Sequence, residues 1–186
     1  ADDASPWAPR SDTGFVIHDT LSARVHPRHA CQALVAALAV RGVEVQTDGS
    51  DRGRVLHATG ADGLFQLSTA LGRPIGNGVK GQAALLRHDA SAVPQLFVDG
   101  LHIIPHADGT VAIGSTSERG YETPTGTDAL LDRLVERAVQ AMPVLHGAEI
   151  IERWAGLRPR PRSRAPMLGP HPLHTGQYIA NGGFKI

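Results

Sequence analysis

Cysteine is almost missing from this chain of 186 residues, which contains a single one, Cys31. One cysteine can form neither an internal disulfide nor a cysteine-rich zinc site, so the sequence favours a reducing, cytoplasmic location. Cys31 lies in an alanine- and leucine-rich stretch with helical spacing. We expect it to be a small buried residue, because free cysteine usually packs as a hydrophobic side chain.

Net charge and long apolar runs are lacking as well. Lys and Arg number 18 and so do Asp and Glu, which gives a formal net charge of zero. This balance argues against non-specific binding to nucleic acid or to an anionic membrane surface. No apolar run approaches the roughly 20 residues that a membrane-spanning helix needs, and the N-terminal stretch ADDASPWAPRSD lacks the order of a signal peptide. We therefore predict no nucleic-acid partner and no membrane span.

The first part of the chain has an α/β pattern. Residues 26–42 combine an early proline, apolar residues at helical spacing and a glycine stop, which predicts a helix. Short strands are expected at residues 43–47 and 54–63, followed by a helix at residues 62–72. A strand, a glycine turn and a helix in this order present backbone groups to a nucleotide in many α/β proteins.

From residue 79 onward the pattern changes to strands. Residues 81–88, 94–106 and 110–117 are β-rich, and Asp108-Gly109 is a hairpin signal. Residues 125–142 form an amphipathic pattern ended by Pro143, so we expect a helix there. Strands at 148–159 and 176–183 complete an α+β unit, an antiparallel sheet covered by that helix. The predicted apolar face of the helix consists of Leu130, Leu131, Leu134, Val135, Ala138, Val139 and Met142.

Common catalytic motifs are missing. The glycine-rich stretch GRPIGNGVKGQ lacks the Ser or Thr that follows the lysine of a phosphate-binding loop, and no His-Glu-x-x-His motif occurs. The serines of LSTAL and SERG lie outside the Gly-x-Ser-x-Gly turn of many hydrolases. The sequence therefore gives little support to a phosphate loop or a hydrolase triad.

Ten histidines raise the question of a metal site. His102 and His106 are four apart in an expected strand, so we predict that both face the same side. No carboxylate ligand is evident near the close pairs, and we interpret them as polar residues that line or flank a cleft. We therefore predict no metal site. The close pairs are His26/His29, His102/His106 and His171/His174.

The stretch RWAGLRPRPRSRAPMLGP crowds arginines and prolines around one of two tryptophans. A residue that precedes proline is forced into an extended backbone, so Arg158 lies on a stiff segment, with Trp154 and Leu157 as apolar anchors. A guanidinium held in this way suits bidentate capture of a carboxylate, although a structural ion pair fits the pattern equally well. No stacking aromatics are interleaved, so we interpret the rest as a solvated basic loop. That loop carries Arg160, Arg162 and Arg164.

Four segments together resemble one family. ERWAGLRPRPRSRAPMLGP followed by YIANGGFKI is similar to the D-amino acid oxidase family of FAD-dependent oxidoreductases, especially its glycine oxidase-like members. HATGADG, VKGQ and LHIIPHADGTVAIGSTSE look like further motifs of that family, in the same order. The resemblance covers nearly the whole chain from about residue 16 onward.

The resemblance implies a flavoprotein that oxidises a small amino acid, with hydride transfer from the α-carbon to FAD and then electron transfer to oxygen or another acceptor. By position, Arg158 matches the arginine that pairs with the substrate carboxylate. Lys185 stands where glycine oxidase has a second substrate-contacting arginine, and His102 where a tyrosine lines its pocket. The implied cofactor-binding residues are Thr59, Gly60, Ala61, Gly183, Phe184, Lys185 and Ile186.

The resemblance also implies a domain plan. We expect residues 1–78 to form part of an α/β, Rossmann-like FAD-binding domain, residues 79–153 the substrate-binding sheet and helix, and residues 154–186 a truncated return to the flavin domain. The family's N-terminal Gly-x-Gly-x-x-Gly unit is absent from these residues, so we expect a fragment that is inactive alone and able to form homo-oligomers. The alternative is a non-catalytic module for small-molecule binding or a subunit interface, without flavin.

Overall fold

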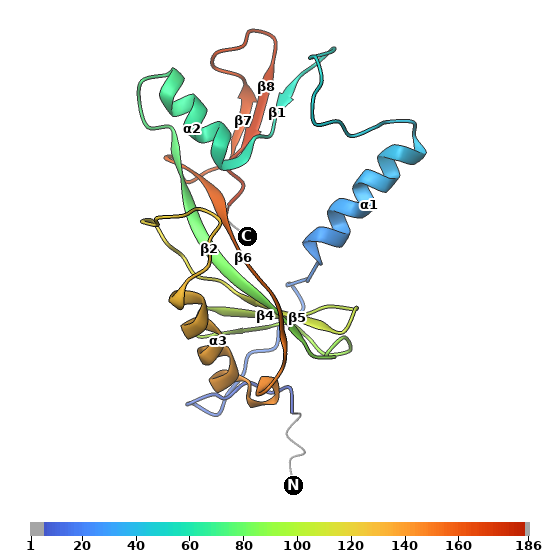
Figure 1. Cartoon of the computed structure of the whole chain (residues 1–186), viewed down its shortest axis with the longest axis vertical. Coiled ribbons are helices and arrows are strands. Elements are labelled where there is room, and N and C mark those ends of the chain that lie inside the picture. Colours follow the sequence, from blue (N-terminus) through green and yellow to red (C-terminus); the bar gives the residue numbers. More distant parts are fainter. Residues whose placement is uncertain (1–5, 185–186) are drawn as a thin grey trace. The chain divides into compact units, whose positions relative to one another are not determined.

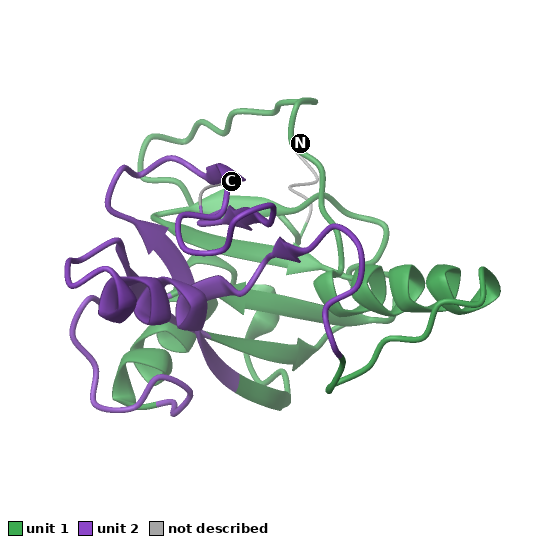
Figure 2. Ribbon diagram, turned by 90° about the horizontal axis from the view of Figure 1, so that it is seen from above, with its two compact units in different colours: residues 1–49, 83–115, 128–153 green, residues 50–82, 116–127, 154–186 purple. Residues whose placement is uncertain are grey.

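The structure, a computed structural model, describes residues 6–184 (Figure 1). The chain forms two compact units, coloured separately in Figure 2. Both long strands, β2 (Gly76–Arg87) and β6 (Ile150–Pro161), contribute residues to each unit. Unit 1 consists of residues 1–49, 83–115 and 128–153, and unit 2 consists of residues 50–82, 116–127 and 154–186.

Unit 1 is built on antiparallel strands. β3 (Leu96–Val98) pairs with β4 (Leu101–Pro105), and β4 pairs with β5 (Thr110–Gly114). β5 pairs in turn with β2, and the strand order of the sheet is β3-β4-β5-β2-β6. The predicted hairpin at Asp108-Gly109 is confirmed, since it joins β4 to β5.

A second Asp-Gly turn joins β3 to β4 and was not predicted. Asp99 and Gly100 have φ angles of 49° and 76°, as a tight two-residue hairpin turn requires. The signal was present in the sequence inside the stretch 94–106, which therefore forms two strands rather than one β-rich segment.

Helix α3 (Ala129–Ala141) covers this sheet through contacts with β4 and β5. Asp128 caps its N-terminus, where the side chain accepts a hydrogen bond from the Leu130 backbone. A short 3-10 helix, Pro143–Leu145, follows. The predicted α+β arrangement of an antiparallel sheet covered by a helix is thereby confirmed.

The core of unit 1 lies between α3 and the sheet. Leu131, Leu134, Ala138 and Met142 are buried there, whereas Leu130 is 41% exposed, so its place on the predicted apolar face is wrong. Trp7 joins the same core, and its indole Nε1 donates a hydrogen bond to the Pro94 carbonyl at 2.8 Å. Leu130 is the second residue of the helix, within the turn that Asp128 caps, and its side chain points outward there.

Helix α1 (Pro27–Val40) matches the predicted boundaries, yet none of its residues is buried. Cys31 is exposed, so the prediction of a buried cysteine is wrong. Helical periodicity reveals an apolar face but cannot say what covers it. Residues 43–47 form no strand either, because an alternating segment needs a partner strand for its backbone hydrogen bonds. No helix in the described part of the chain is long and apolar enough to cross a membrane.

Unit 2 contains a three-stranded sheet with the order β1-β8-β7. β1 (Leu56–His57) runs parallel to β8 (Tyr178–Asn181), and β7 (Met167–Pro170) runs antiparallel to β8. Helix α2 (Gly60–Ala70) begins directly after β1. The predicted order of strand, glycine turn and helix is confirmed, although the strand is much shorter than residues 54–63.

Two adjacent leucines of α3 provide a test of this packing. Leu131 is fully buried, so Leu131→Ala should lower the free energy of unfolding by about 2–5 kcal/mol, through lost apolar burial and a residual cavity. Leu130→Ala, at the exposed neighbour, should change it by about 0.5 kcal/mol or less. Urea denaturation of the two variants measures both values, and equal losses would contradict the packing of α3.

Candidate functional site

The turn between β1 and α2 is held by the end of β8. Thr59 is the residue before the helix, and Gly60 has a φ of 61°, a left-handed conformation that glycine adopts easily. The Asn181 side-chain amide donates a hydrogen bond to the Gly60 carbonyl at 2.8 Å. The parallel pairing of β1 with β8 brings these segments together despite their distance in sequence. The first backbone groups of α2 are therefore fixed relative to the sheet.

A cavity of about 630 Å³ opens at this helix N-terminus. Thr59, Gly60 and Ala61, predicted from the sequence as cofactor-binding residues, all line it. Its volume lies in the range of small-molecule sites, and aromatic and aliphatic walls suit a planar ring system. The remaining lining residues are Asp62, Phe65, Tyr121, Pro124, Thr125 and Leu157.

The Asp62 carboxylate limits what this cavity can hold. A helix N-terminus by itself favours anions, but Asp62 already places a negative side chain in the first turn of α2 and on the cavity wall. A phosphate in this position would face that carboxylate. The cavity is therefore better suited to an uncharged ring or a hydroxyl-bearing chain than to a phosphate.

Beside it, the motif VKGQ forms a buried polar group. Lys80 is 2% exposed, and its Nζ lies 3.7 Å from Glu118 Oε2. Glu118 Oε1 accepts hydrogen bonds from the Gln82 amide, at 3.0 Å, and from the Thr116 hydroxyl. The backbones of Lys80 and Glu118 also bond to each other in both directions at 2.9 Å. Buried polar groups are stable only when they have hydrogen-bond or ion-pair partners, and these residues supply partners to one another.

Arg158 is held next to this group, on β6. Its guanidinium Nη2 donates a hydrogen bond to the Thr116 carbonyl at 3.1 Å. The guanidinium also lies over Gly81, where an added Cβ would come within 2.2 Å of Nη2. A side chain on residue 81 would therefore displace the arginine. Leu157, the preceding residue, lines the cavity, and Arg158 faces the other side as neighbouring residues of a strand do.

The other predicted site residues are placed as follows. Gly183 and Phe184 follow β8 in unit 2, where the Phe184 backbone N–H donates to the Gly182 carbonyl at 3.0 Å. His102 belongs to unit 1, on β4, exposed and with its ring 4.8 Å from that of Phe97. Lys185 and Ile186 lie outside the described residues.

Two expectations about polar side chains are wrong. His102 is exposed but His106 is buried, because β4 ends at Pro105 and His106 belongs to the hairpin connection. Arg160 was expected in a solvated loop, yet it lies within β6 and is only partly exposed. The loop starts later, and the Arg162 backbone N–H still donates to the Ile75 carbonyl at 2.8 Å.

The pair His171/His174 is part of a larger histidine group. The His57 ring from β1 lies 4.5 Å from that of His171 and 5.4 Å from that of His174. Burial, followed by the nearby His57 and His174, lowers the pKa of His171. His57 also contacts Gln177, with Nε2 and Oε1 2.6 Å apart. Sequence spacing could not reveal His57, because the pairing of β1 with β8 supplies the contact.

Three comparisons relate this chain to known proteins. It is 37% identical over 109 residues to glycine oxidase from Pseudomonas putida, a match that covers 58% of this chain and 30% of that protein. Glycine oxidase from Bacillus licheniformis matches over the whole chain at 24% identity, and this covers 56% of its own length. The crystal structure of glycine oxidase from Geobacillus kaustophilus superposes with a TM-score of 0.60 at 28% identity, over 70% of this chain and 36% of the other.

The chain thus spans about half, or less, of the length of these relatives. Their fold, with a Rossmann-like and a substrate domain, agrees with the predicted fold class. The sequence model described as FAD dependent oxidoreductase matches residues 1–185, almost the entire chain. The chain therefore belongs to the DAO family of FAD dependent oxidoreductases.

Proposed function

We propose that this chain is part of an enzyme that oxidises a small amino acid with FAD. One observation carries the proposal: the Arg158 guanidinium is fixed over Gly81 by a stiff proline-flanked strand and by the Thr116 carbonyl. A guanidinium oriented in advance can bind a carboxylate through two parallel hydrogen bonds without losing further side-chain freedom. Every α-amino acid carries a carboxylate, so such a residue would orient the substrate.

The fit of the cofactor rests on the cavity at the start of α2. Its walls contain Phe65, Tyr121 and Leu157, which suit contact with a flat ring, while Asp62 disfavours phosphate there. Thr59, Gly60 and Ala61 would contact the uncharged part of FAD. When bound, FAD supplies the acceptor for the hydride that leaves the amino acid's α-carbon. The described residues thus fit part of the cofactor, and the pyrophosphate would be held elsewhere.

Other residues complete the proposed site. We assign Gly183, Phe184, Lys185 and Ile186 to the neighbourhood of the flavin, and Lys185 to a second contact with the substrate carboxylate. A lysine there would keep the positive charge of the family's arginine but not its planar fork. His102 would line the substrate pocket. Oxygen or another acceptor would reoxidise the flavin.

We further propose the domain roles predicted from the sequence: residues 1–78 and 154–186 serve the flavin, and residues 79–153 the substrate. The one stretch with Gly-x-Gly-x-x-Gly spacing, residues 76–81, lies inside strand β2 and does not open a helix. In the described residues this spacing therefore does not form the strand–turn–helix that supplies most of the backbone grip on a dinucleotide pyrophosphate. The chain would therefore act as part of a longer enzyme, in the cytoplasm.

Arg158 provides the direct test. In the complete gene product that contains this chain, Arg158→Ala should reduce kcat/KM for the amino acid by an amount equal to about 2–5 kcal/mol, because a charged partner of the carboxylate is lost. Arg162→Ala is the control, since Arg162 lies in the turn after β6 and is exposed. Steady-state kinetics on a panel of small amino acids measures both. Equal losses for the two variants would reject the assigned role.

Gly81 tests the same arrangement without touching the arginine. Gly81→Ala places a methyl group where the guanidinium lies, so kcat/KM should fall at least about tenfold, or about 1.4 kcal/mol. Gly156→Ala is the matched control on β6, where an added Cβ meets nothing within 4 Å. If Gly81→Ala keeps full activity while circular dichroism shows an intact fold, the carboxylate is bound elsewhere.

Flavin retention tests the cofactor assignment. After incubation with FAD and desalting, the 186-residue chain should retain less than stoichiometric flavin, because the cavity offers no phosphate grip. The complete gene product should remain yellow after the same treatment. A visible absorbance scan measures both. Stoichiometric flavin on the 186-residue chain would show that these residues suffice and would overturn the proposed division of the cofactor site.

A further inference from the structure

Unit 1 contains a histidine and carboxylate group outside the proposed amino acid site. His26, His29 and Asp108 each offer one ligand atom, and these atoms lie within 4.8 Å of one another. Among the described residues, a group of three or more His, Cys, Asp or Glu side chains with ligand atoms this close together occurs here. Sequence spacing could not reveal a carboxylate near His26 and His29, because Asp108 comes from the β4–β5 hairpin, about 80 positions away.

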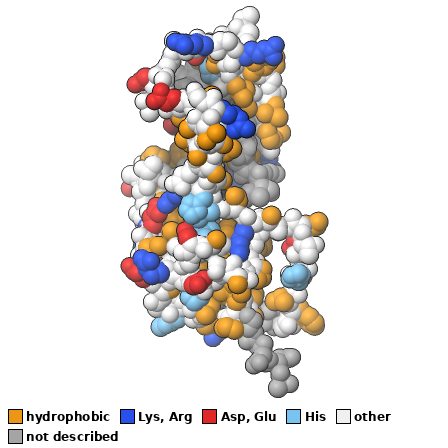
Figure 3. Space-filling model, turned by 90° about the vertical axis from the view of Figure 1, so that its right-hand side faces the viewer, with side chains coloured by type: hydrophobic (Ala, Val, Ile, Leu, Met, Phe, Trp, Pro, Cys, Tyr) orange, Lys and Arg blue, Asp and Glu red, His pale blue; other side chains and the backbone are white. Residues whose placement is uncertain are grey.

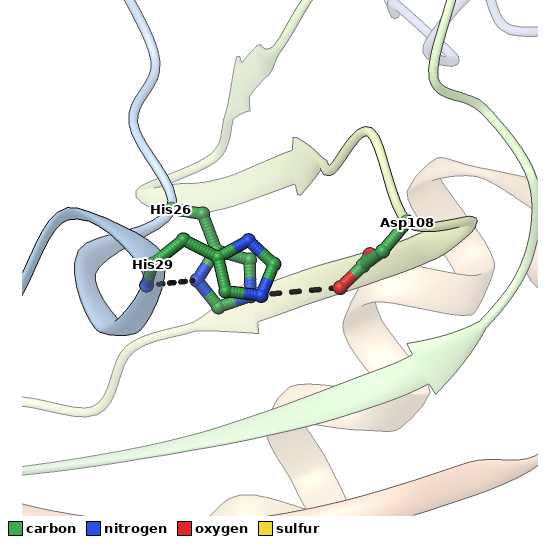
Figure 4. A group of neighbouring side chains, drawn as sticks. All are labelled: His26, His29 and Asp108. Carbon is green, nitrogen blue, oxygen red and sulfur yellow. Dashed lines mark hydrogen bonds and ion pairs between the residues drawn. The ribbon is translucent and has the colours of Figure 1, made fainter. Parts of the chain in front are cut away.

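The three side chains lie together, with the two imidazole rings stacked and the carboxylate of Asp108 beside them (Figure 4). The imidazole rings of His26 and His29 are stacked with their centroids 3.8 Å apart, and Asp108 Oδ2 lies 3.8 Å from His26 Nε2. Two ligands of a tetrahedral zinc ion are about 3.4 Å apart, given bond lengths near 2.0–2.1 Å. The ligand atoms are thus near coordination distance, but at least one of the stacked rings must turn out of the parallel arrangement for both in-plane nitrogen lone pairs to meet at one ion.

Asp108 is oriented by a second layer of contacts. Its Oδ1 accepts a hydrogen bond from the Thr110 hydroxyl at 2.6 Å and another from the Thr110 backbone N–H at 3.2 Å. His106 is buried beneath, with Nδ1 3.0 Å from the same hydroxyl and its ring 4.1 Å from that of His26. Such supporting bonds fix the direction of metal ligands and raise affinity. Oδ2 is left facing His26.

Two arginines fix the histidine segment to the same unit. Arg24 donates to the Ser91 carbonyl, at 2.6 Å, and to that of Val93. Arg28 forms a two-pronged ion pair with Glu152, with each N–O distance at 2.5 Å. These contacts lie on either side of His26. The start of α1 is therefore held to β6 and to the segment between β2 and β3, independently of the three side chains themselves.

From this geometry we propose that His26, His29 and Asp108 bind one Zn²⁺ ion. Two imidazoles and one carboxylate are a common set of zinc ligands, and water would take the fourth position. The site is open to solvent, since the side chains of His26 and Asp108 are 17% and 37% exposed. The space-filling view likewise shows a group of histidines at the surface beside acidic side chains (Figure 3).

Besides the loss of the parallel ring stacking, binding breaks one hydrogen bond. His26 Nδ1 accepts a long hydrogen bond of 3.4 Å from the His29 backbone N–H. Coordination through His26 Nε2 moves the ring proton to Nδ1, so this weak bond is given up. The gain is a tie between the first turn of α1 and the hairpin. The ion would thus fix a helix that has no buried residues of its own.

The test is zinc binding by the tag-free 186-residue chain after removal of metals with a chelator. Isothermal titration with ZnCl₂ should give one ion per chain. Loss even of an outer-shell partner typically costs about 10–100-fold in metal affinity. His29→Gln and Asp108→Asn, which each remove a ligand, should therefore raise the Kd at least about tenfold. His29 is exposed, so its variant keeps the fold, which circular dichroism checks. The double variant His18→Gln/His146→Gln changes two exposed histidines outside the group and should bind like the wild type.

Substitution with Co²⁺ gives a second readout. Wild type should show the intense visible bands of a low-symmetry site with nitrogen and oxygen ligands, and both ligand variants should lose them. Absence of saturable one-to-one zinc binding would overturn the proposal. So would binding that survives both ligand variants, including binding that His171→Gln abolishes, because this would place the ion in the histidine group of unit 2.

Discussion

The buried ion pair between Lys80 and Glu118 is the interaction on which the arginine site depends. Removing two charges from water is costly unless they are paired and their remaining atoms are satisfied. Gln82 and Thr116 supply those extra bonds to the Glu118 carboxylate, and the two backbones bond to each other as well. The segment that contains Thr116 is thereby fixed on β2, and the Thr116 carbonyl in turn orients Arg158. The family-like motif VKGQ is thus a support for the arginine.

The cavity at α2 adds a second constraint on the chemistry. Its glycine turn resembles a nucleotide site, but the carboxylate of Asp62 takes the position where a phosphate would gain from the helix dipole. The same wall carries Phe65 and Tyr121. Under the proposed function, a cofactor with both a ring and a pyrophosphate would then need two separate binding regions, and the cavity of unit 2 would be the apolar one.

Local patterns predicted most of the elements but not their partners. The helix at 125–142, the Asp108-Gly109 hairpin and the strand–glycine–helix order follow from periodicity and turn chemistry, and the structure confirms them. Cys31 and the segment 43–47 were misjudged because burial and strand pairing depend on what lies opposite. For the site, Thr59, Gly60 and Ala61 do share a cavity, whereas the supports of Arg158 come from Gly81 and Thr116. Those contacts join residues that are far apart in the sequence, so sequence spacing cannot predict them.

Gly81 shows how such a support can be recognised. Glycine inside a strand costs about 0.5–1 kcal/mol relative to alanine, and it leaves no side chain to pack. A strand that tolerates it needs a compensating reason, and at position 81 the reason is the guanidinium that fills the place of a Cβ. Neither Arg158 nor Gly81 is informative alone, because the sequence does not show that one packs over the other. Their pairing across β2 and β6 makes the arginine rigid, and rigidity is the property that the proposed anchor for a carboxylate needs.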